Sequence, residues 1–220
     1  MTNLLCASPI QGLVIRVVSL NACGVPVTGS SSAQVVWDGF TQVQTSPQYD
    51  NGNRVITRKA DGTLCVNFKF PDQYTNDEVT IDLCGWNVGL PVGIINARLL
   101  TATASPTGTG FAHGTWSNAT PKHFSLELWQ VPASSCDGTG TAYYPYHAWP
   151  HLSDGKRGDT TFGPDASMLQ LKANSYDASP LWTVGNSYLG SGQVVAGDHY
   201  LYNLQSTTPP PSACAINAYP

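Results

Sequence analysis

The sequence contains little charge of either sign. Only 11% of its residues are Asp, Glu, Lys or Arg, whereas an average soluble domain has about 25%. Such a surface repels other copies of itself only weakly, which favours a subunit whose surfaces become buried in an assembly. The net charge is −4, and Lys and Arg never occur in runs longer than two residues. The sequence therefore lacks the basic cluster that nucleic-acid binding requires.

Long apolar runs are also missing. No stretch reaches the roughly 18 residues that a membrane helix needs, and the first seven residues lack the basic region and apolar length of a signal peptide. We therefore expect the chain to be made and kept in a reducing cytoplasm. Small buried thiols are then favoured over disulfides by roughly three to one. The six cysteines are Cys6, Cys23, Cys65, Cys84, Cys136 and Cys214.

Signatures of catalysis are absent as well. Residues 29–33 lack the second glycine of a nucleophile elbow, and no cysteine lies in a thiol-protease signature. Asp77 and Glu78 are adjacent, so on a strand they would point to opposite faces and could not flank one glycosidic bond. No Gly-x-Gly-x-x-Gly opens a helix after a strand. We predict that the protein is not an enzyme and binds no cofactor.

Histidine is the remaining candidate for metal binding or catalysis. His147 and His151 have the spacing of two ligands on a helix, but Trp149 and Pro150 between them exclude that helix. In an extended segment the two could still share a face, but two ordinary histidines in an aromatic patch are favoured over a surface metal pair. We predict no metal site at any histidine. The five are His113, His123, His147, His151 and His199.

The sequence is rich in short β-branched and aromatic segments that end at turn residues. Residues 13–20 predict a strand, and residues 34–45 predict a second strand with a bend or bulge at Gly39. Asn51-Gly52 and Asp61-Gly62 favour positive φ and predict tight turns between further extended segments. The first third of the chain is therefore expected to form a β-meander.

The second half continues this pattern. Residues 123–131 alternate between apolar and polar side chains, which predicts a strand with one buried face. Residues 142–150 are aromatic and extended, with two prolines that confine them to a sheet edge or to discontinuous pairing. Residues 168–173 and 200–204 also predict strands. Apolar residues at 88, 92 and 95 lie on one helical face, although two glycines and a proline weaken this short helix.

The order of several short segments resembles one family. The segments lie at 16–24, 26–29, 38–40, 43–44, 46–49, 61–67, 71–73 and 83–85, and weaker ones at 126–129, 158–159, 182–185 and 198–199. None has chemistry of its own, but their joint order over residues 16–85 is specific. In this order the chain resembles the major tail tube proteins of long-tailed, siphovirus-type phages of actinobacteria.

The resemblance implies a mainly β fold, a β-sandwich or barrel with one short helix and extended terminal arms. Residues 1–12 would be the N-terminal arm, 13–206 the tail-tube domain with a long hairpin loop at 47–62 and an insertion at 103–122, and 207–220 a proline-rich arm that reaches outward. Such proteins form hexameric rings that stack into the tail tube, the conduit for DNA ejection.

The resemblance also implies partners and contacts. The chain would bind copies of itself, the tape-measure protein and the tail-terminator protein, in a virion assembled in the bacterial cytoplasm. DNA would pass through without specific binding, and no membrane would be involved. The candidate inter-ring and inter-subunit contacts are Pro47, Gln48, Tyr49, Asp50, Asn51, Arg54, Arg58, Asp61, Pro209, Pro210 and Pro211.

Two alternatives stay open at this point. The first is a carbohydrate-binding or decoration domain on a virion surface, because aromatic side chains can form a sugar-binding platform. Core and interface packing is favoured for these aromatics by about four to one. The second is a secreted β-sandwich enzyme, which would need an export route and disulfides. The aromatics are Trp116, Trp129, Tyr143, Tyr144, Tyr146, Trp149 and Trp182.

Overall fold

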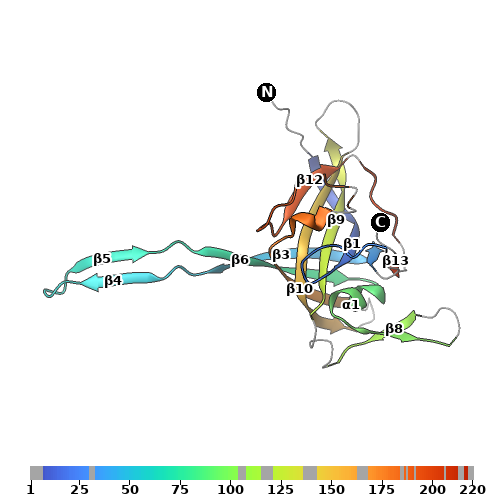
Figure 1. Cartoon of the computed structure of the whole chain (residues 1–220), viewed down its shortest axis with the longest axis horizontal. Coiled ribbons are helices and arrows are strands. Elements are labelled where there is room, and N and C mark those ends of the chain that lie inside the picture. Colours follow the sequence, from blue (N-terminus) through green and yellow to red (C-terminus); the bar gives the residue numbers. More distant parts are fainter. Residues whose placement is uncertain are drawn as a thin grey trace.

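The computed structural model describes residues 7–29, 33–103, 108–114, 121–135, 143–162, 168–183, 186, 188–190, 192–205, 207–212 and 216–217. Strands contain 58% of the residues and helices 6%, which confirms the predicted mainly β fold with one short α-helix (Figure 1). None of the helices in these ranges has the length and apolar character needed to span a bilayer.

The strands are β1 (Ala7–Leu20), β2 (Gln34–Trp37), β3 (Phe40–Asp50), β4 (Arg54–Arg58), β5 (Leu64–Lys69), β6 (Gln73–Leu83), β7 (Arg98–Thr101), β8 (Gly108–Ala112), β9 (His123–Ser135), β10 (Tyr144–Thr161), β11 (Met168–Ser175), β12 (Leu201–Gln205) and β13 (Ile216–Asn217). The helical segments are α1 (Gly89–Ile94) and the 3₁₀ turn η2 (Pro180–Thr183). The predicted short helix is confirmed as α1, and the strands expected at 168–173 and 200–204 are confirmed as β11 and β12.

One large antiparallel sheet forms the body of the molecule. Its order is β13-β2-β1-β9-β10-β11-β6-β3, and β12 pairs with the first part of β10. The pairs β4–β5 and β7–β8 form two separate two-stranded ribbons. The second ribbon occupies part of the segment 103–122, which was expected to be a loop. Four strands separate β1 from β3, yet the ring of Phe40 on β3 lies against Gly12 on β1, because the sheet is strongly curled.

The predicted meander and the single strand at 34–45 are wrong. That segment divides into β2 and β3: β3 is one edge strand of the curled sheet, and β2 lies next to β13, the other edge strand. The strand is interrupted at residues 38–39, between the end of β2 and the start of β3. A Cβ on Gly39 would lie 2.6 Å from the Trp37 ring. The bend at Gly39 was therefore predicted correctly, but it ends one strand and begins another.

The sheet is covered on both faces. On one face Ile15, Ile81, Leu126 and Trp149 form the larger core, which α1 closes with Leu90 and Ile94. The opposite face carries a second core that the chain after β11 covers. Both faces of β9 are therefore buried from Phe124 to Trp129, and the prediction of one buried face for 123–131 is wrong.

The second core contains a buried ion pair. Arg16 on β1 and Glu127 on β9 are register partners, and the Arg16 Nη2 atom lies 2.6 and 2.9 Å from the two carboxylate oxygens. The guanidinium also lies over the Trp129 and Tyr188 rings, 5.5 and 5.1 Å from their centroids. Burial raises the pKa of Glu127, and Arg16 opposes this shift. The pair thus joins two central strands inside an aromatic core.

The termini differ from the predicted arms. Residues 7–12, expected in the N-terminal arm, belong to β1 and pair with β9; residues 1–6 lie outside the described ranges. The proline-rich segment 207–212 does not reach outward but lies on the body, where the Ser212 hydroxyl donates to Asp38 Oδ1 at 2.9 Å. Beyond it, β13 pairs with β2 and adds an edge strand to the sheet.

Prolines and cysteines also bear on the predictions. β10 is central and contains Pro145 and Pro150, and its register with β9 is irregular between Trp149 and Leu152. Discontinuous pairing, one of the two predicted solutions, is what accommodates Pro150.

Cys23, Cys65 and Cys84 are free thiols, as expected, but all three are exposed, so their predicted burial is wrong. Cys6, Cys136 and Cys214 lie outside the described ranges.

The Arg16–Glu127 pair gives a stability prediction. We expect Glu127→Ala to lower the free energy of unfolding by about 3–5 kcal/mol, because it leaves the buried guanidinium without its counter-charge. The double variant Arg16→Met/Glu127→Leu removes both charges and should keep most of the stability. Urea denaturation followed by tryptophan fluorescence measures both. A Glu127→Ala chain as stable as the wild type would contradict this role.

Candidate assembly interface

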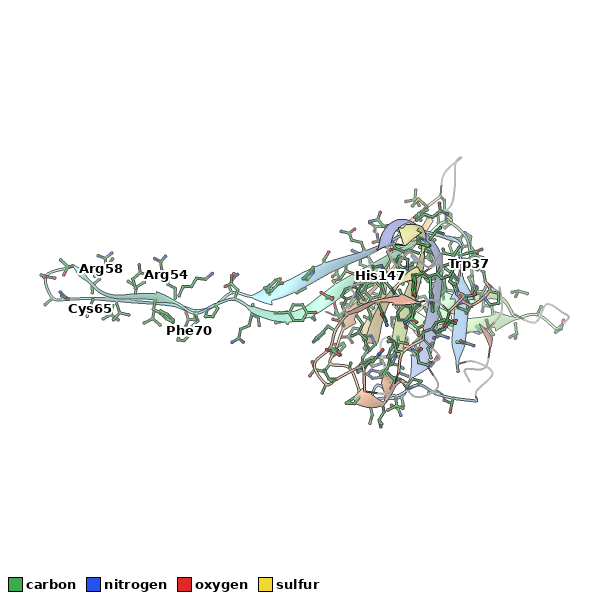
Figure 2. The ribbon with its side chains drawn as sticks, turned by 90° about the horizontal axis from the view of Figure 1, so that it is seen from above. Trp37, Arg54, Arg58, Cys65, Phe70 and His147 are labelled. Atoms are coloured by element: carbon green, nitrogen blue, oxygen red, sulfur yellow. The ribbon has the colours of Figure 1, made fainter. Side chains whose placement is uncertain are left out.

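A long β-ribbon projects from the body. The ladder between β3 and β6 ends at the pair Asp50 and Gln73. From there the chain continues through a neck, formed by residues 51–53 and 70–72, into the β4–β5 ribbon. Figures 1 and 2 show this ribbon extending away from the sheet, without the body beside it. Every residue of β4 and β5 is exposed. The predicted segment 47–62 therefore covers only the first strand and the tip of a longer hairpin, because residue 47 pairs with Asp77 and the return strand begins after the turn at 59–63.

The neck holds the two strands close together. A Cβ on Gly52 would lie 1.8 Å from the Phe70 carbonyl oxygen, so only glycine fits. The Gly52 N–H donates to Asp72 Oδ1 at 2.8 Å, and the Phe70 N–H donates to the Asn53 carbonyl at 3.0 Å. Lys69 forms an ion pair with the same Asp72 oxygen at 2.9 Å. These contacts set the direction in which the ribbon leaves the body.

The ribbon has two chemically different faces. Residues opposite each other in an antiparallel pair share a face. The register pairs Val55 with Phe68 and Thr57 with Val66, which makes one face apolar, and the Phe68 and Phe70 rings meet at 5.0 Å. On the other face Arg54 pairs with Lys69. Figure 2 shows Arg54 and Arg58 on one side of the ribbon and Cys65 and Phe70 on the other.

The predicted contact residues are divided between the projecting hairpin and the body. Pro47, Gln48, Tyr49 and Asp50 are exposed at the end of β3, Asn51 is in the neck, Arg54 and Arg58 are on β4, and Asp61 is in the terminal turn, where it accepts the Thr63 N–H at 2.9 Å. Pro209, Pro210 and Pro211 lie instead on the body. The apolar residues of β5 were missed, although the alternation at 64, 66, 68 and 70 in the sequence was a signal for them.

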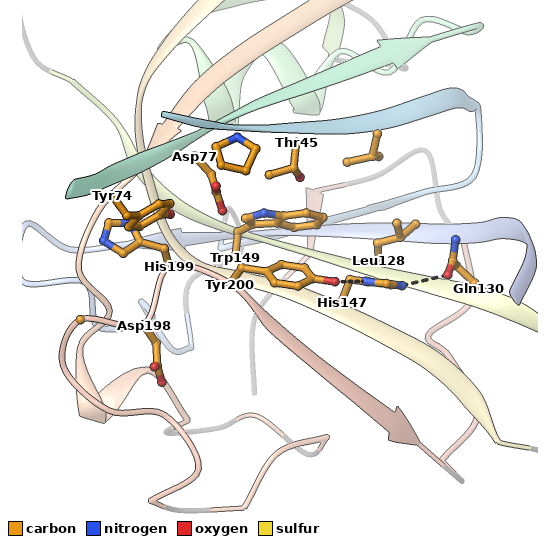
Figure 3. A pocket seen from close by; sticks show the side chains of 13 residues that line it. Thr45, Tyr74, Asp77, Leu128, Gln130, His147, Trp149, Asp198, His199 and Tyr200 are labelled. Atoms are coloured by element: carbon orange, nitrogen blue, oxygen red, sulfur yellow. Dashed lines mark hydrogen bonds between the residues drawn. The ribbon is translucent and has the colours of Figure 1, made fainter. Parts of the chain in front are cut away.

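A groove lies on the body at the root of the ribbon (Figure 3). Its volume is about 600 Å³, and its apolar walls include Val43, Leu128 and Trp149. Tyr200 lies beside Trp149, with ring centroids 5.3 Å apart. The His147 ring bonds to the Tyr200 hydroxyl through Nδ1 and to Gln130 Oε1, 2.8 Å from Nε2. Four strands and the loop before β12 contribute these residues, so no local motif in the sequence could reveal the groove.

The groove is acidic. Asp77 and Asp198 line it, and within the described residues neither carboxylate has a Lys or Arg partner. Asp77 is 5% exposed, and this burial raises the pKa of its carboxyl group, because water solvates the charged form poorly there. Burial lowers the pKa of His147, so this ring favours its neutral form and adds little positive charge. Burial raises the pKa of the Tyr74 hydroxyl to about 12, so this group adds no charge to the groove even in alkaline solution.

A second polar cluster lies beside the groove. The Ser175 hydroxyl lies 2.8 Å from His199 Nδ1, and His199 Nε2 lies 3.2 Å from Asp177 Oδ1. Catalytic triads use the same three residue types. Here, however, Ser175 is 2% exposed within β11 and its hydroxyl already accepts the Asp77 N–H at 2.7 Å. We interpret the chain of bonds as a link between β11 and the loop before β12.

His123, His151 and four of the aromatic residues are packed against other side chains. His123 and His151 contact each other at 3.0 Å, and burial lowers the pKa of His151. His147 and His151 lie on β10 with different partners, and no group of three metal-ligating side chains occurs within the described ranges. Among the aromatics proposed as a sugar platform, Trp129, Tyr146, Trp149 and Trp182 are buried, which confirms core packing for these four.

No known protein-family model matches the chain, and no curated protein matches it in sequence. The ribbon and the groove are therefore the features that a proposal about function has to explain.

The close packing of the neck around Gly52 predicts that adding a methyl group there will disturb the ribbon. We expect Gly52→Ala to force the neck apart, because its Cβ would overlap the Phe70 carbonyl, and so to loosen the ribbon while leaving the body folded. Trypsin should then cleave after Arg54, Arg58 or Lys69 faster than in the wild type. Gly190→Ala is the matched control, since its Cβ would meet nothing closer than 3.8 Å. Equal cleavage rates in all three chains would contradict the close fit at Gly52.

Proposed function

We propose that this chain is a structural subunit that assembles with copies of itself into stacked hexameric rings, as the major tail tube protein of a long-tailed actinobacterial phage. The rings enclose a bore through which the genome passes without specific binding. Support comes from the order of short segments between residues 16 and 85, from the mainly β fold and from the projecting ribbon.

The β4–β5 ribbon carries the proposal. Its apolar side chains Val55, Val66, Phe68 and Phe70 are 41%, 43%, 53% and 50% exposed. An isolated two-stranded ribbon is at best marginally stable in water, and an exposed apolar patch of this kind marks an interaction site. A ribbon held away from its own body by a fitted neck can cover this face only on another molecule. Self-assembly supplies that molecule in every ring and every stack.

The energetic gain grows with the number of copies. Covering the exposed half of one such side chain contributes on the order of 1 kcal/mol, from which the cost of ordering the contact is subtracted. A tube repeats the same contact in every subunit, so a modest gain per ribbon gives a stable assembly. The ribbon edges, with unpaired backbone groups, add further contacts of the same kind.

The remaining expected partners fit this arrangement as proposals. We assign the contacts between subunits to the ribbon and to the end of β3, and not to Pro209, Pro210 and Pro211, which lie on the body. A tape-measure protein inside the tube and a terminator protein at its end would then meet the assembled rings. The net charge of −4 suits a bore along which DNA slides without binding.

Electron microscopy tests this function directly. We expect the concentrated wild-type chain, in negative stain, to form rings or tubes. A variant in which residues 51–72 are replaced by an Asn-Gly turn should close the β3–β6 hairpin and remain a folded monomer without tubes. Thermal unfolding checks that its body is intact. Tubes of normal length from this variant would remove the role of the ribbon, and a wild-type chain that never assembles would overturn the function.

A further inference from the structure

The charges of the chain are divided between the ribbon and the body. Residues 51–72 contain four of the ten Lys and Arg and two of the fourteen Asp and Glu, which gives a net charge of +2; the rest of the chain has six and twelve, which gives −6. Within the described ranges Arg54, Arg58 and Lys59 have no carboxylate partner. The ribbon is therefore basic and the body acidic.

The groove at the root of the ribbon has the complementary chemistry. Its accessible apolar side chains are Val43 and Tyr200, behind which Leu128 and Trp149 are buried. Its carboxylates are Asp77, which is 5% exposed, and Asp198, which accepts the Val195 N–H at 2.9 Å; neither has a Lys or Arg partner within the described ranges. Because burial raises the pKa of Asp77, a cation brought beside it would stabilise its charged form. The exposed aromatic ring of Tyr200 also attracts cations. A segment that combines apolar and basic side chains matches this groove.

We propose that the groove of each copy receives the β4–β5 ribbon of a second copy. The apolar face around Phe68 covers the apolar wall, and the long stems of Arg54 and Arg58 carry their charges past the ribbon edge to the carboxylates. The ribbon points away from its own body, so it cannot occupy its own groove (Figure 2). This inference rests on the proposed function and names the two surfaces that meet.

The contact is heterologous, because the ribbon of one copy meets a different surface on the next. Each copy then offers one ribbon and one groove, and such contacts propagate into a closed ring or an open filament. Since the groove lies where the ribbon leaves the body, each bound ribbon also lies beside the root of the next ribbon. The opposite charges steer the encounter, so assembly should weaken as salt increases.

Charge reversal on each surface tests the proposal in the full-length chain. Thr45 lines the groove and points into it (Figure 3), so Thr45→Lys places a cation where we expect the basic ribbon. The second variant is Arg54→Glu/Arg58→Glu. Each alone should raise the concentration at half-assembly by roughly tenfold or more, because like charges then meet. Gln44→Lys is the matched control: it adds the same charge on the same strand, outside the groove, and should assemble like the wild type.

Mixing the two defective chains provides the decisive measurement. The Glu-bearing ribbon fits the Lys-bearing groove, and the wild-type ribbon of one chain fits the wild-type groove of the other, so the mixture should assemble again. Light scattering and negative stain report the result. Wild-type-like assembly of Thr45→Lys, or failure of the mixture to recover while the wild type assembles, would overturn the groove assignment and leave the proposed function intact. A wild-type chain without any assembly would remove both.

Discussion

A two-stranded ribbon has no interior, and this constraint governs how the molecule must behave. Each face of β4–β5 meets water in the isolated chain, including the face that carries Val55, Phe68 and Phe70. The body cannot cover this face, because the Gly52 neck directs the ribbon away from it. The apolar surface therefore stays available to another molecule, and its basic opposite face favours an acidic partner such as the body of a second copy.

The rest of the fold provides a rigid base for this arm. The long strands β3 and β6 run from the sheet into the neck, and the sheet is fixed by a core on each face. Arg16 and Glu127 join β1 to β9 inside the second core, where their mutual attraction offsets the cost of burying both charges. Because the body is rigid, less conformational entropy is lost when the ribbon binds another molecule. The same curled sheet brings β3, β6, β9 and β10 together around the groove.

The sequence predicts the local features of this structure better than the distant ones. Asp61-Gly62 marks the tip of the ribbon, and the mainly β class follows from β-branched segments such as 13–20. Curling of the sheet is not local: it separates β2 from β3 and buries both faces of β9, so the meander and the half-exposed strand were wrong. The groove depends on the same long-range pairing. Apolar residues alternate with polar ones along β5 and so indicate its apolar face, but the family resemblance points to contacts at residues 47–62 only.

The central claim is that assembly covers the ribbon, and the exposed Cys65 on β5 reports on the ribbon directly. Its thiol is exposed in the isolated chain, as are those of Cys23 and Cys84 on the body. The most direct measurement is the rate at which a maleimide labels Cys65, determined by peptide mass spectrometry for the monomer and for the concentrated, assembled protein. Labelling of Cys65 should be fast in the monomer and strongly suppressed after assembly. Equal labelling of Cys65 in both states would show that the ribbon stays uncovered and would contradict the account.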